Sequence, residues 1–273
     1  MPELPEVETV RRSLEPYLVG KMVVGIEILL ERIIKKPEPE EFYRLLANRK
    51  IRALARRGKY LLIRLEENYT WVIHLRMTGQ LIYTNERMNH KHLRLAFHLN
   101  DGNWLNFIDM RTFGSMYLLP VDRLGEITCL ATMGPEPLDN SFHLEELTQR
   151  LGRRKGAVKA VLLDQSVVAG LGNIYVDEAL FEAKIDPRRE AASLRKNEVA
   201  QLHKAIIKVL EKAVINRGTT FRDYLDGAGR KGGNQQFLNV YQRSGEPCVR
   251  CGTEISKIRV GGRGTSFCSK CQG

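Results

Sequence analysis

Short apolar runs separated by polar turns fill the first half of the chain. Runs of this length, rich in Val, Ile, Leu and Tyr, are typical of β-strands, and Asn100–Asn103 is typical of a hairpin turn. We predict strands at Lys21–Leu30, Ile51–Leu54, Tyr60–Leu65, Thr70–Leu75, Gln80–Tyr83, His92–Leu99, Trp104–Ile108 and Ser115–Leu119. So many short strands before any long helix predict an antiparallel β-sandwich or barrel.

Helical periodicity flanks these strands on both sides. Apolar residues three or four apart between Val7 and Leu18 predict a helix over Pro5–Leu18, and Gly20 ends it. After a linker at Gly134–Pro137, helical patterns dominate. The other predicted helices are Glu40–Ala47, Phe142–Leu151, Gly156–Leu163, Ile174–Ala183 and Lys196–Asn216. The chain is therefore expected to be an α+β multidomain protein.

A glycine-rich segment, Gly218–Asn234, follows the last helix and precedes a predicted strand at Phe237–Gln242. A segment of this length and composition inside a compact chain is usually functional or mobile.

The chain is strongly basic, with a net charge of +11 over 273 residues. Residues 1–134 carry 20 Lys and Arg against 16 Asp and Glu, and the remainder carries 23 against 16, so both halves share the excess. A basic protein of this size most often binds a polyanion, with nucleic acid ahead of anionic lipid. No apolar run approaches 18 residues and no secretory leader is visible, so we expect a cytoplasmic protein.

The N-terminal dipeptide after Met1 carries a candidate reactive group. Cells generally remove the initiator Met before a small residue, which would leave the ring nitrogen of Pro2 as a secondary amine. An α-amino group has a pKa near ~8, against ~10.4 for lysine, so part of it is uncharged and nucleophilic at neutral pH. Such an amine suits Schiff-base chemistry, with Glu3 beside it to move protons. The alternative is an idle terminus with a proline that merely begins a helix.

Four of the five cysteines lie in the last 26 residues of the chain. Their arrangement is two Cys-x-x-Cys pairs, separated by sixteen residues: Cys248, Cys251, Cys268 and Cys271. This spacing indicates a structural zinc site with no open coordination position, and disulfides are the alternative. Arg263 lies between the pairs, flanked by glycines that allow a close approach to another surface, or is simply a solvated charge on a turn. The fifth, Cys129, is predicted to be a buried thiol.

Basic and helix-start residues in the second half suggest contacts with phosphate. The cationic run is Arg150, Arg153, Arg154, Lys155 and Lys159, which is either a solvated helix face or a phosphate-binding surface. Asn173 is placed to cap the helix that follows Gly170–Gly172, and helix N-termini bind phosphate.

Several side chains at strand ends in the first half have two interpretations. Lys59 begins an apolar strand and is either solvated or directed toward Pro2. Met77 and Phe113 each lie in a turn after a strand, where they either join the core or, if exposed, wedge into a base stack. His90 is a weak candidate for a phosphate or base contact, and the His90–His92 stretch has too few ligands for a metal.

Taken together, these stretches resemble the bacterial formamidopyrimidine-DNA glycosylase family, in its oxidised-purine branch. The resemblance runs from end to end through several motifs in the family's order. They are PELPEVET, RRGKYLL, HLRMTG, DMRTFG, GPEPL, the LLDQ to VAGLGNIYVDEALF region, and the cysteine hairpin. Leu4 and the turn residues favour the purine branch over the sister branch that removes oxidised pyrimidines. Thr112 departs from the basic residue that relatives tend to carry, which puts one phosphate contact in doubt.

The resemblance implies a bifunctional DNA glycosylase and AP lyase acting through β,δ-elimination. It implies that Pro2 is the nucleophile at the sugar C1′, with Glu3 as acid and base. Lys59 would assist β-elimination and Arg263 δ-elimination. The implied DNA contacts are His90, Arg111, Arg154 and Asn173, and the residues that fill the space of the everted nucleotide are Met77, Arg111 and Phe113; Glu6 matches a carboxylate near the active site.

The resemblance also implies the architecture and the partners. The expected parts are a catalytic β-sandwich with its first helix over 2–134, a helix–two-turn–helix domain over 135–217, a lesion-covering loop over 218–236 and a zinc hairpin over 237–273. The implied cofactor is one structural Zn²⁺. The implied partner is duplex DNA with oxidised purines or abasic sites, bound by a monomer between the two halves, at the nucleoid. An oxidised-pyrimidine glycosylase and a non-catalytic damage-binding protein are the alternatives.

Overall fold

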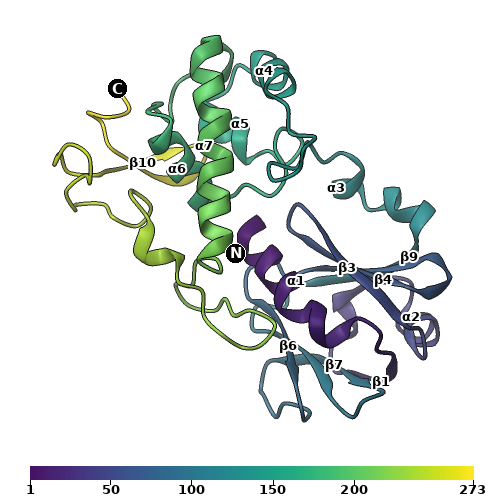
Figure 1. The fold of residues 1–273 in the computed structure, drawn as a ribbon. Coiled ribbons are helices and arrows are strands. Elements are labelled where there is room, and N and C mark those ends of the chain that lie inside the picture. The colour runs from purple at the N-terminus through teal and green to yellow at the C-terminus, as the bar shows by residue number, and fades with distance from the viewer. The chain divides into compact units, whose positions relative to one another are not determined.

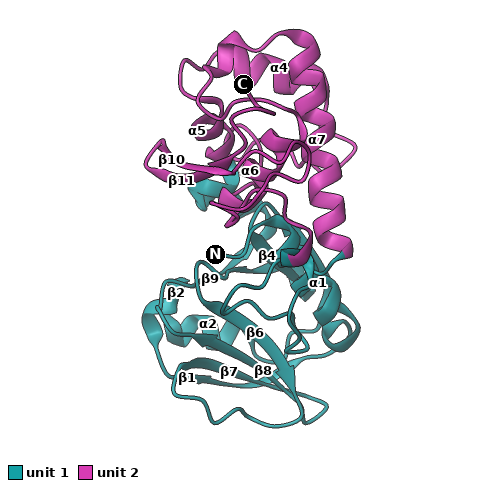
Figure 2. Cartoon of the chain, turned by 90° about the vertical axis from the view of Figure 1, so that its left-hand side faces the viewer, with its two compact units in different colours: residues 1–131, 216–235 teal, residues 132–215, 236–273 magenta.

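The chain folds into two compact units in a computed structural model that describes all residues from Met1 to Gly273 (Figures 1 and 2). The first unit comprises Met1–Ala131 and Asn216–Gln235, and the second comprises Thr132–Ile215 and Gln236–Gly273. The glycine-rich segment is therefore part of the N-terminal unit, although more than eighty residues separate it from that unit's other residues in sequence.

Two β-sheets form the body of the first unit. The strands are β1 (Val23–Ile28), β2 (Ile34–Lys36), β3 (Ile51–Arg57), β4 (Tyr60–Leu65), β5 (Tyr69–His74), β6 (Gly79–Thr84), β7 (Leu93–Leu99), β8 (Trp104–Asp109) and β9 (Ser115–Pro120). One sheet has the order β1-β7-β8-β6 and the other β2-β9-β5-β4-β3. All eight predicted strands are present. The additional strand β2 is only three residues long, which is too short to show an alternating pattern in the sequence. It pairs in parallel with β9, whereas the prediction was of antiparallel strands.

Helix α1 (Leu4–Leu18) contributes its apolar face to the core between the sheets, as predicted. Val7, Val10, Leu14 and Leu18 are fully buried, because their spacing places them on one side of the helix. The rings of Trp71 on β5 and Phe97 on β7 lie 4.5 Å apart in the same core. The first helix is thus a packed part of the sandwich rather than a loose terminus. The other helices of this unit are α2 (Pro39–Leu46) and α3 (Thr128–Ala131).

The second unit is helical and ends in a β-hairpin. Its helices are α4 (Leu144–Gly152), α5 (Val158–Leu163), α6 (Asn173–Glu182) and α7 (Lys196–Ile215), and its strands are β10 (Ser256–Val260) and β11 (Arg263–Phe267). The four predicted helices agree with these bounds to within about a turn. Helix α6 packs against both α7 and β11, and it is buried along nearly its whole length. Helix α6 therefore forms the surface against which the hairpin packs.

The prediction of a strand at Phe237–Gln242 is wrong. Backbone N–H groups of Asn239, Val240 and Tyr241 all donate to the buried carboxylate of Glu178 on α6, at 2.9–3.0 Å. A backbone segment whose consecutive N–H groups all donate to one carboxylate cannot form an extended strand. The prediction that Cys129 is buried is also wrong, because α3 is a single surface turn without buried residues and the Cys129 side chain is exposed.

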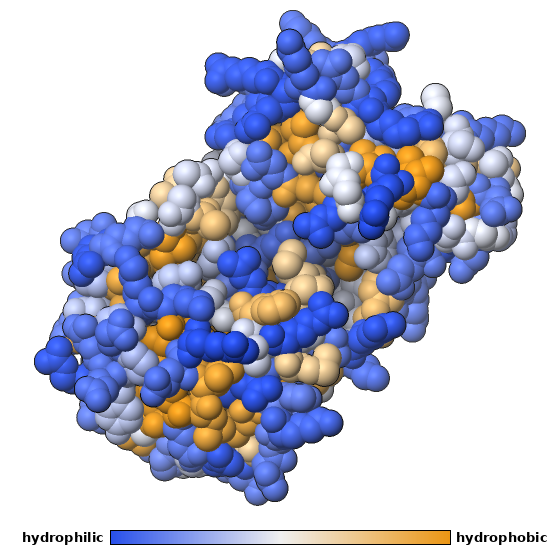
Figure 3. Space-filling model, turned by 180° about the vertical axis from the view of Figure 1, so that it is seen from behind, coloured by the Kyte–Doolittle hydropathy of each residue, from blue (hydrophilic) through white to orange (hydrophobic).

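The surface is consistent with the polar composition of the sequence. The face shown in Figure 3 is largely hydrophilic, with smaller apolar patches among charged side chains. None of the helices combines the length and the apolar character that a membrane crossing requires.

Candidate functional site

The start of α1 holds Pro2 and Glu3 in a fixed, buried position. Glu3 is the N-cap residue, and its backbone N–H donates to the Glu6 carboxylate at 2.8 Å. The other oxygen of Glu6 accepts the backbone N–H of Thr219, also at 2.8 Å. Glu6 is 1% exposed, so both bonds are shielded from water. Glu6 therefore ties the N-terminus and the glycine-rich segment to one carboxylate.

The register of α1 against β3 brings Lys59 to the same level as Pro2 and Glu3. The Glu8 carboxylate pairs with Arg56 at 3.3 Å, and one turn later Arg11 reaches the carbonyl of Leu54. The helix and the strand thus run in opposite directions. Going back from Glu8 to Glu3 covers about 7.5 Å of helix, which corresponds to roughly two strand residues beyond Arg56. The β3–β4 turn with Lys59 lies there, and Lys59 is buried rather than solvated.

A buried carboxylate joins the two turns that carry the wedge candidates. Asp109 is fully buried and accepts the hydroxyl of Thr78 at 2.5 Å and the N–H of Gly114 at 2.8 Å. Thr78 in turn accepts the N–H of Arg111 at 3.0 Å. The two turns, far apart in sequence, are therefore one rigid structure.

This structure presents Met77, Arg111 and Phe113 together on the outside of the first unit. Met77 is 41% and Phe113 58% exposed, which excludes the core interpretation for both. The Arg111 guanidinium contacts the Met77 sulfur at 3.2 Å. Thr112 between them has φ of +56°, a costly conformation for a non-glycine residue, and its hydroxyl accepts a hydrogen bond from Arg32. The Arg32 guanidinium therefore lies at this turn, although position 112 itself carries no basic residue.

Other predicted contact residues lie on the surface of their own units. His90 in the first unit is exposed, with its Nδ1 accepting the N–H of His92. Arg154 in the second unit is exposed and lies 3.4 Å from the carboxylate of Asp164. Both side chains are accessible to a ligand.

Two expectations for the second unit are wrong. Asn173 does not cap α6, because Gly172 is the N-cap; Asn173 is the first helical residue, and its amide donates to the carbonyl of Gly264 at 3.0 Å. Lys159 belongs to neither a solvated face nor a phosphate-binding surface. It is fully buried and paired with Asp177 at 2.7 Å. The helical period of α5 turns Lys159 inward, toward that carboxylate.

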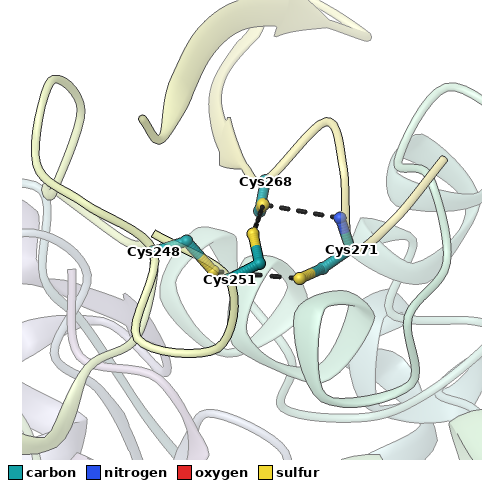
Figure 4. Close-up of side chains that lie close together, drawn as sticks. All are labelled: Cys248, Cys251, Cys268 and Cys271. Atoms are coloured by element: carbon teal, nitrogen blue, oxygen red, sulfur yellow. Dashed lines mark hydrogen bonds between the residues drawn. The ribbon is translucent and has the colours of Figure 1, made fainter. Parts of the chain in front are cut away.

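The four cysteines converge from two tight turns, as Figure 4 shows. Their sulfur atoms lie within 4.8 Å of one another, with Cys251 and Cys268 at 3.4 Å and Cys248 and Cys271 at 3.9 Å. A tetrahedral site with Zn–S bonds of ~2.3 Å requires sulfurs about 3.8 Å apart. The cluster therefore fits one structural Zn²⁺, which would fix the two turns that flank the β10–β11 hairpin. The predicted zinc site is confirmed.

Three acidic residues with structural consequences for the site were not predicted: Asp109, Asp177 and Glu178. Each is at most 2% exposed and accepts hydrogen bonds from distant backbone or side-chain groups. The one visible signal is the acidic pair Asp177-Glu178 inside an otherwise apolar helix, since buried carboxylates require partners.

Three family models match the chain in sequence. They are the formamidopyrimidine-DNA glycosylase N-terminal domain over residues 1–116, the formamidopyrimidine-DNA glycosylase H2TH domain over 133–224, and the zinc finger found in FPG and IleRS over 245–273. The formamidopyrimidine-DNA glycosylase of Pelotomaculum thermopropionicum is 48% identical over 273 residues, covering 100% of this chain and 99% of the relative. The chain belongs to the formamidopyrimidine-DNA glycosylase family.

Solved structures of this family have the same fold throughout. The Lactococcus lactis enzyme bound to abasic-site DNA is 39% identical with a TM-score of 0.93, covering 99% of each chain. The MutM (FPG) protein of Thermus thermophilus is 39% identical with a TM-score of 0.91, covering 100% of this chain and 99% of that one. The α+β fold class that the resemblance implied is thus confirmed.

Proposed function

We propose that this chain is a base-excision repair enzyme that removes oxidised purines, 8-oxoguanine and formamidopyrimidines, from duplex DNA and then cleaves the strand. The observation that supports this proposal most directly is the buried position of Pro2 and Glu3, which lead into α1, in a chain of this family. Fixed geometry matters because an attacking amine gains rate from being held within reach of its target carbon.

In the proposed reaction Pro2 acts as the nucleophile. A base inside the duplex is out of reach, so the damaged nucleotide is first everted, and Met77, Arg111 and Phe113 fill the space it leaves. The Pro2 nitrogen, freed by removal of Met1, attacks the sugar C1′ and the glycosidic bond breaks, with Glu3 moving the protons. The C1′–O4′ bond of the sugar then opens, with O4′ taking a proton from Glu3, and the product is an iminium, which keeps its positive charge because its nitrogen carries no proton to lose.

Strand cleavage follows from that charge. The iminium acidifies C2′, and loss of a C2′ proton, assisted by Lys59, breaks the bond from C3′ to the 3′ phosphate. A second elimination, assisted by Arg263, removes a proton from C4′ and breaks the bond from C5′ to the 5′ phosphate. Because one nucleophile drives base loss and both eliminations, base removal and strand scission are coupled.

The remaining residues bind and organise the substrate. His90, Arg111, Arg154 and Asn173 contact the DNA backbone, in keeping with the exposed positions of His90, Arg111 and Arg154 and with the excess of basic residues in both halves. The partner is duplex DNA with oxidised purines or abasic sites, bound by one copy of the chain at the nucleoid in the cytoplasm.

We also propose a functional division of the chain into four parts. These are the catalytic part over 2–134, the helix–two-turn–helix part over 135–217, the lesion-covering loop over 218–236 and the zinc hairpin over 237–273. The loop assignment is supported by its bonds to Glu6, which place it beside the start of α1.

A panel of lesion duplexes tests this function. Single-turnover excision should be fastest for 8-oxoguanine and formamidopyrimidine, slower for thymine glycol and absent for undamaged DNA. Faster excision of thymine glycol would assign the chain to the oxidised-pyrimidine branch. Tight binding of lesions without cleavage of any of them would support a damage-binding protein instead.

A further inference from the structure

The buried ion pair between Lys159 on α5 and Asp177 on α6 has no place in the chemistry above. Both side chains are essentially inaccessible to solvent, and their charged atoms lie 2.7 Å apart. Burying such a pair carries a desolvation penalty of several kcal/mol per ion, and apolar residues of similar volume are often at least as stabilising. A contribution to global stability is therefore a weak explanation for it.

The partners of this pair point to another role. The Lys159 ammonium also donates to the carbonyl of Gly264 at 2.8 Å. Asp177 accepts the backbone N–H of Ser266 at 3.0 Å through its other oxygen. Gly264 and Ser266 lie two residues apart on β11, so both groups belong to the same strand edge. The pair thus bonds the outer edge of β11 as a neighbouring strand would.

Arg263 directly precedes the first of these anchored residues. Asn173 donates to the same Gly264 carbonyl at 3.0 Å, which gives this one oxygen two donors. The hairpin turn is also close to α5, because a Cβ on Gly261 would come within 2.8 Å of the Ala160 side chain. Arg263 itself is exposed at the end of the hairpin, and the anchored residues of its strand are Gly264 and Ser266.

We propose that Lys159 and Asp177 are positioning residues for Arg263, and that by fixing β11 they set how much of the reaction proceeds to δ-elimination. This inference rests on the function proposed above. An apolar pair cannot replace them fully, because position 159 must donate to a carbonyl and position 177 must accept an N–H. The zinc fixes the far ends of the hairpin, and the ion pair fixes the strand that carries Arg263.

The test uses full-length variants on a duplex with one abasic site. The variants are Asp177→Asn and the double variant Lys159→Met/Asp177→Leu, which removes both charges while keeping side-chain volume. Lys208→Met is the matched control, because Lys208 forms an exposed ion pair with Glu182 elsewhere in the second unit. Four quantities are measured for each: borohydride-trapped adduct, zinc per chain, the ratio of β- to δ-elimination products, and the salt dependence of binding to a tetrahydrofuran-containing duplex.

We expect the double variant to bind zinc and to form adduct like wild type, but to stop mainly after β-elimination. Because a misplacement of about 1 Å can cost up to ~10²-fold, the δ-elimination rate should fall roughly tenfold or more. Binding to a tetrahydrofuran-containing duplex should lose about one unit of its log–log salt slope, as expected when one phosphate contact is lost. Lys208→Met should leave all of these unchanged.

A wild-type product ratio and salt slope in both variants would overturn the positioning role and leave the proposed function intact. A proportional loss of adduct, zinc and both eliminations would also overturn it, because it would show a purely structural pair. Absence of adduct with the wild-type chain would instead overturn the proposed function itself, and the role of Arg263 with it.

Discussion

The carboxylate of Glu6 accepts the backbone N–H of Thr219 at 2.8 Å, although 213 residues separate the two in sequence. The hydroxyl of Tyr224 donates to the Glu6 carbonyl in the same place. Burial and the nearby Glu6 charge raise the pKa of Tyr224 well above its usual range, so this donor keeps its proton. The glycine-rich segment is therefore hydrogen-bonded, through Thr219 and Tyr224, to the helix that follows Pro2.

Glu6→Gln should loosen this segment. A glutamine has one acceptor oxygen and cannot accept both the Glu3 and the Thr219 N–H groups, so one buried donor loses its partner at a cost of ~1–3 kcal/mol. Hydrogen exchange at Thr219–Gln235 should speed up, and urea should unfold the variant earlier. Glu15→Gln on the same helix is the control, since Glu15 pairs only at the surface with Arg11. Equal exchange rates in both variants would contradict the role of Glu6.

Asp109→Asn should weaken binding to everted lesions. Asparagine cannot accept from both Thr78 and Gly114, so the two turns that present Met77 and Phe113 lose their shared anchor. A loss of ~1–2 kcal/mol corresponds to roughly 5- to 30-fold weaker binding of an 8-oxoguanine duplex. Fluorescence anisotropy measures this, with exposed Asp122→Asn as control. Unchanged lesion affinity would show that Asp109 does not organise the wedge.

His74 should make the fold sensitive to mild acid. Burial lowers the pKa of His74 to about 3, helped by the charges of Arg76 and Lys59, and its Nδ1 accepts the N–H of Arg76 at 2.9 Å. The unfolded chain binds the histidine proton near its ordinary pKa of ~6.5, whereas the folded chain does not. The stability contribution is therefore complete above pH ~6.5 and is lost as pH falls toward 3.

The measurement is the urea midpoint of wild type and His74→Gln at pH 7.5 and pH 5. Wild type should lose up to ~1–2 kcal/mol more than the variant over this interval, because one extra proton binds the unfolded state. His143→Gln, at an exposed histidine in the second unit, should behave like wild type. If the stability of wild type and of His74→Gln changed equally between pH 7.5 and pH 5, His74 would be taking up its proton in the folded state as readily as in the unfolded chain.

Cys268→Ser should impair zinc retention and DNA binding together. Structural zinc sites contribute on the order of 10–16 kcal/mol of folding free energy, and a serine hydroxyl is a poor replacement for a thiolate. Zinc content and affinity for a lesion duplex should both fall. Cys129→Ser is the matched control, because Cys129 lies outside the cluster. DNA binding that survives zinc loss would show that the hairpin does not organise the interface.

Local patterns were sufficient to predict much of this structure. The strands and helices with several apolar residues in register were predicted, since a single period determines which face is buried. The zinc site was predicted because all four ligands lie in two short motifs. The chemistry of a free secondary amine makes Pro2 a candidate nucleophile without any knowledge of the fold, and its role stays a prediction.

The errors come from interactions between distant residues. Charge alone predicts that Lys159 lies at the surface, because it does not reveal that Asp177 lies opposite it. The segment at Phe237–Gln242 has a strand-like composition, but Glu178, some sixty residues away, binds its backbone instead. Asn173 resembles a helix cap, yet it is the first residue inside α6, and its amide donates to the carbonyl of Gly264. In each case the deciding partner is supplied by tertiary structure.

The central claim is that the Pro2 nitrogen forms the covalent bond to DNA. Incubation with an 8-oxoguanine duplex and borohydride, followed by tryptic digestion and mass spectrometry, tests it directly. We predict that the reduced adduct lies on the N-terminal peptide Pro2–Arg11, at the proline nitrogen, and that a chain retaining Met1 forms none. An adduct located at Lys59 or another lysine, or no adduct with the trimmed wild-type chain, would contradict the account.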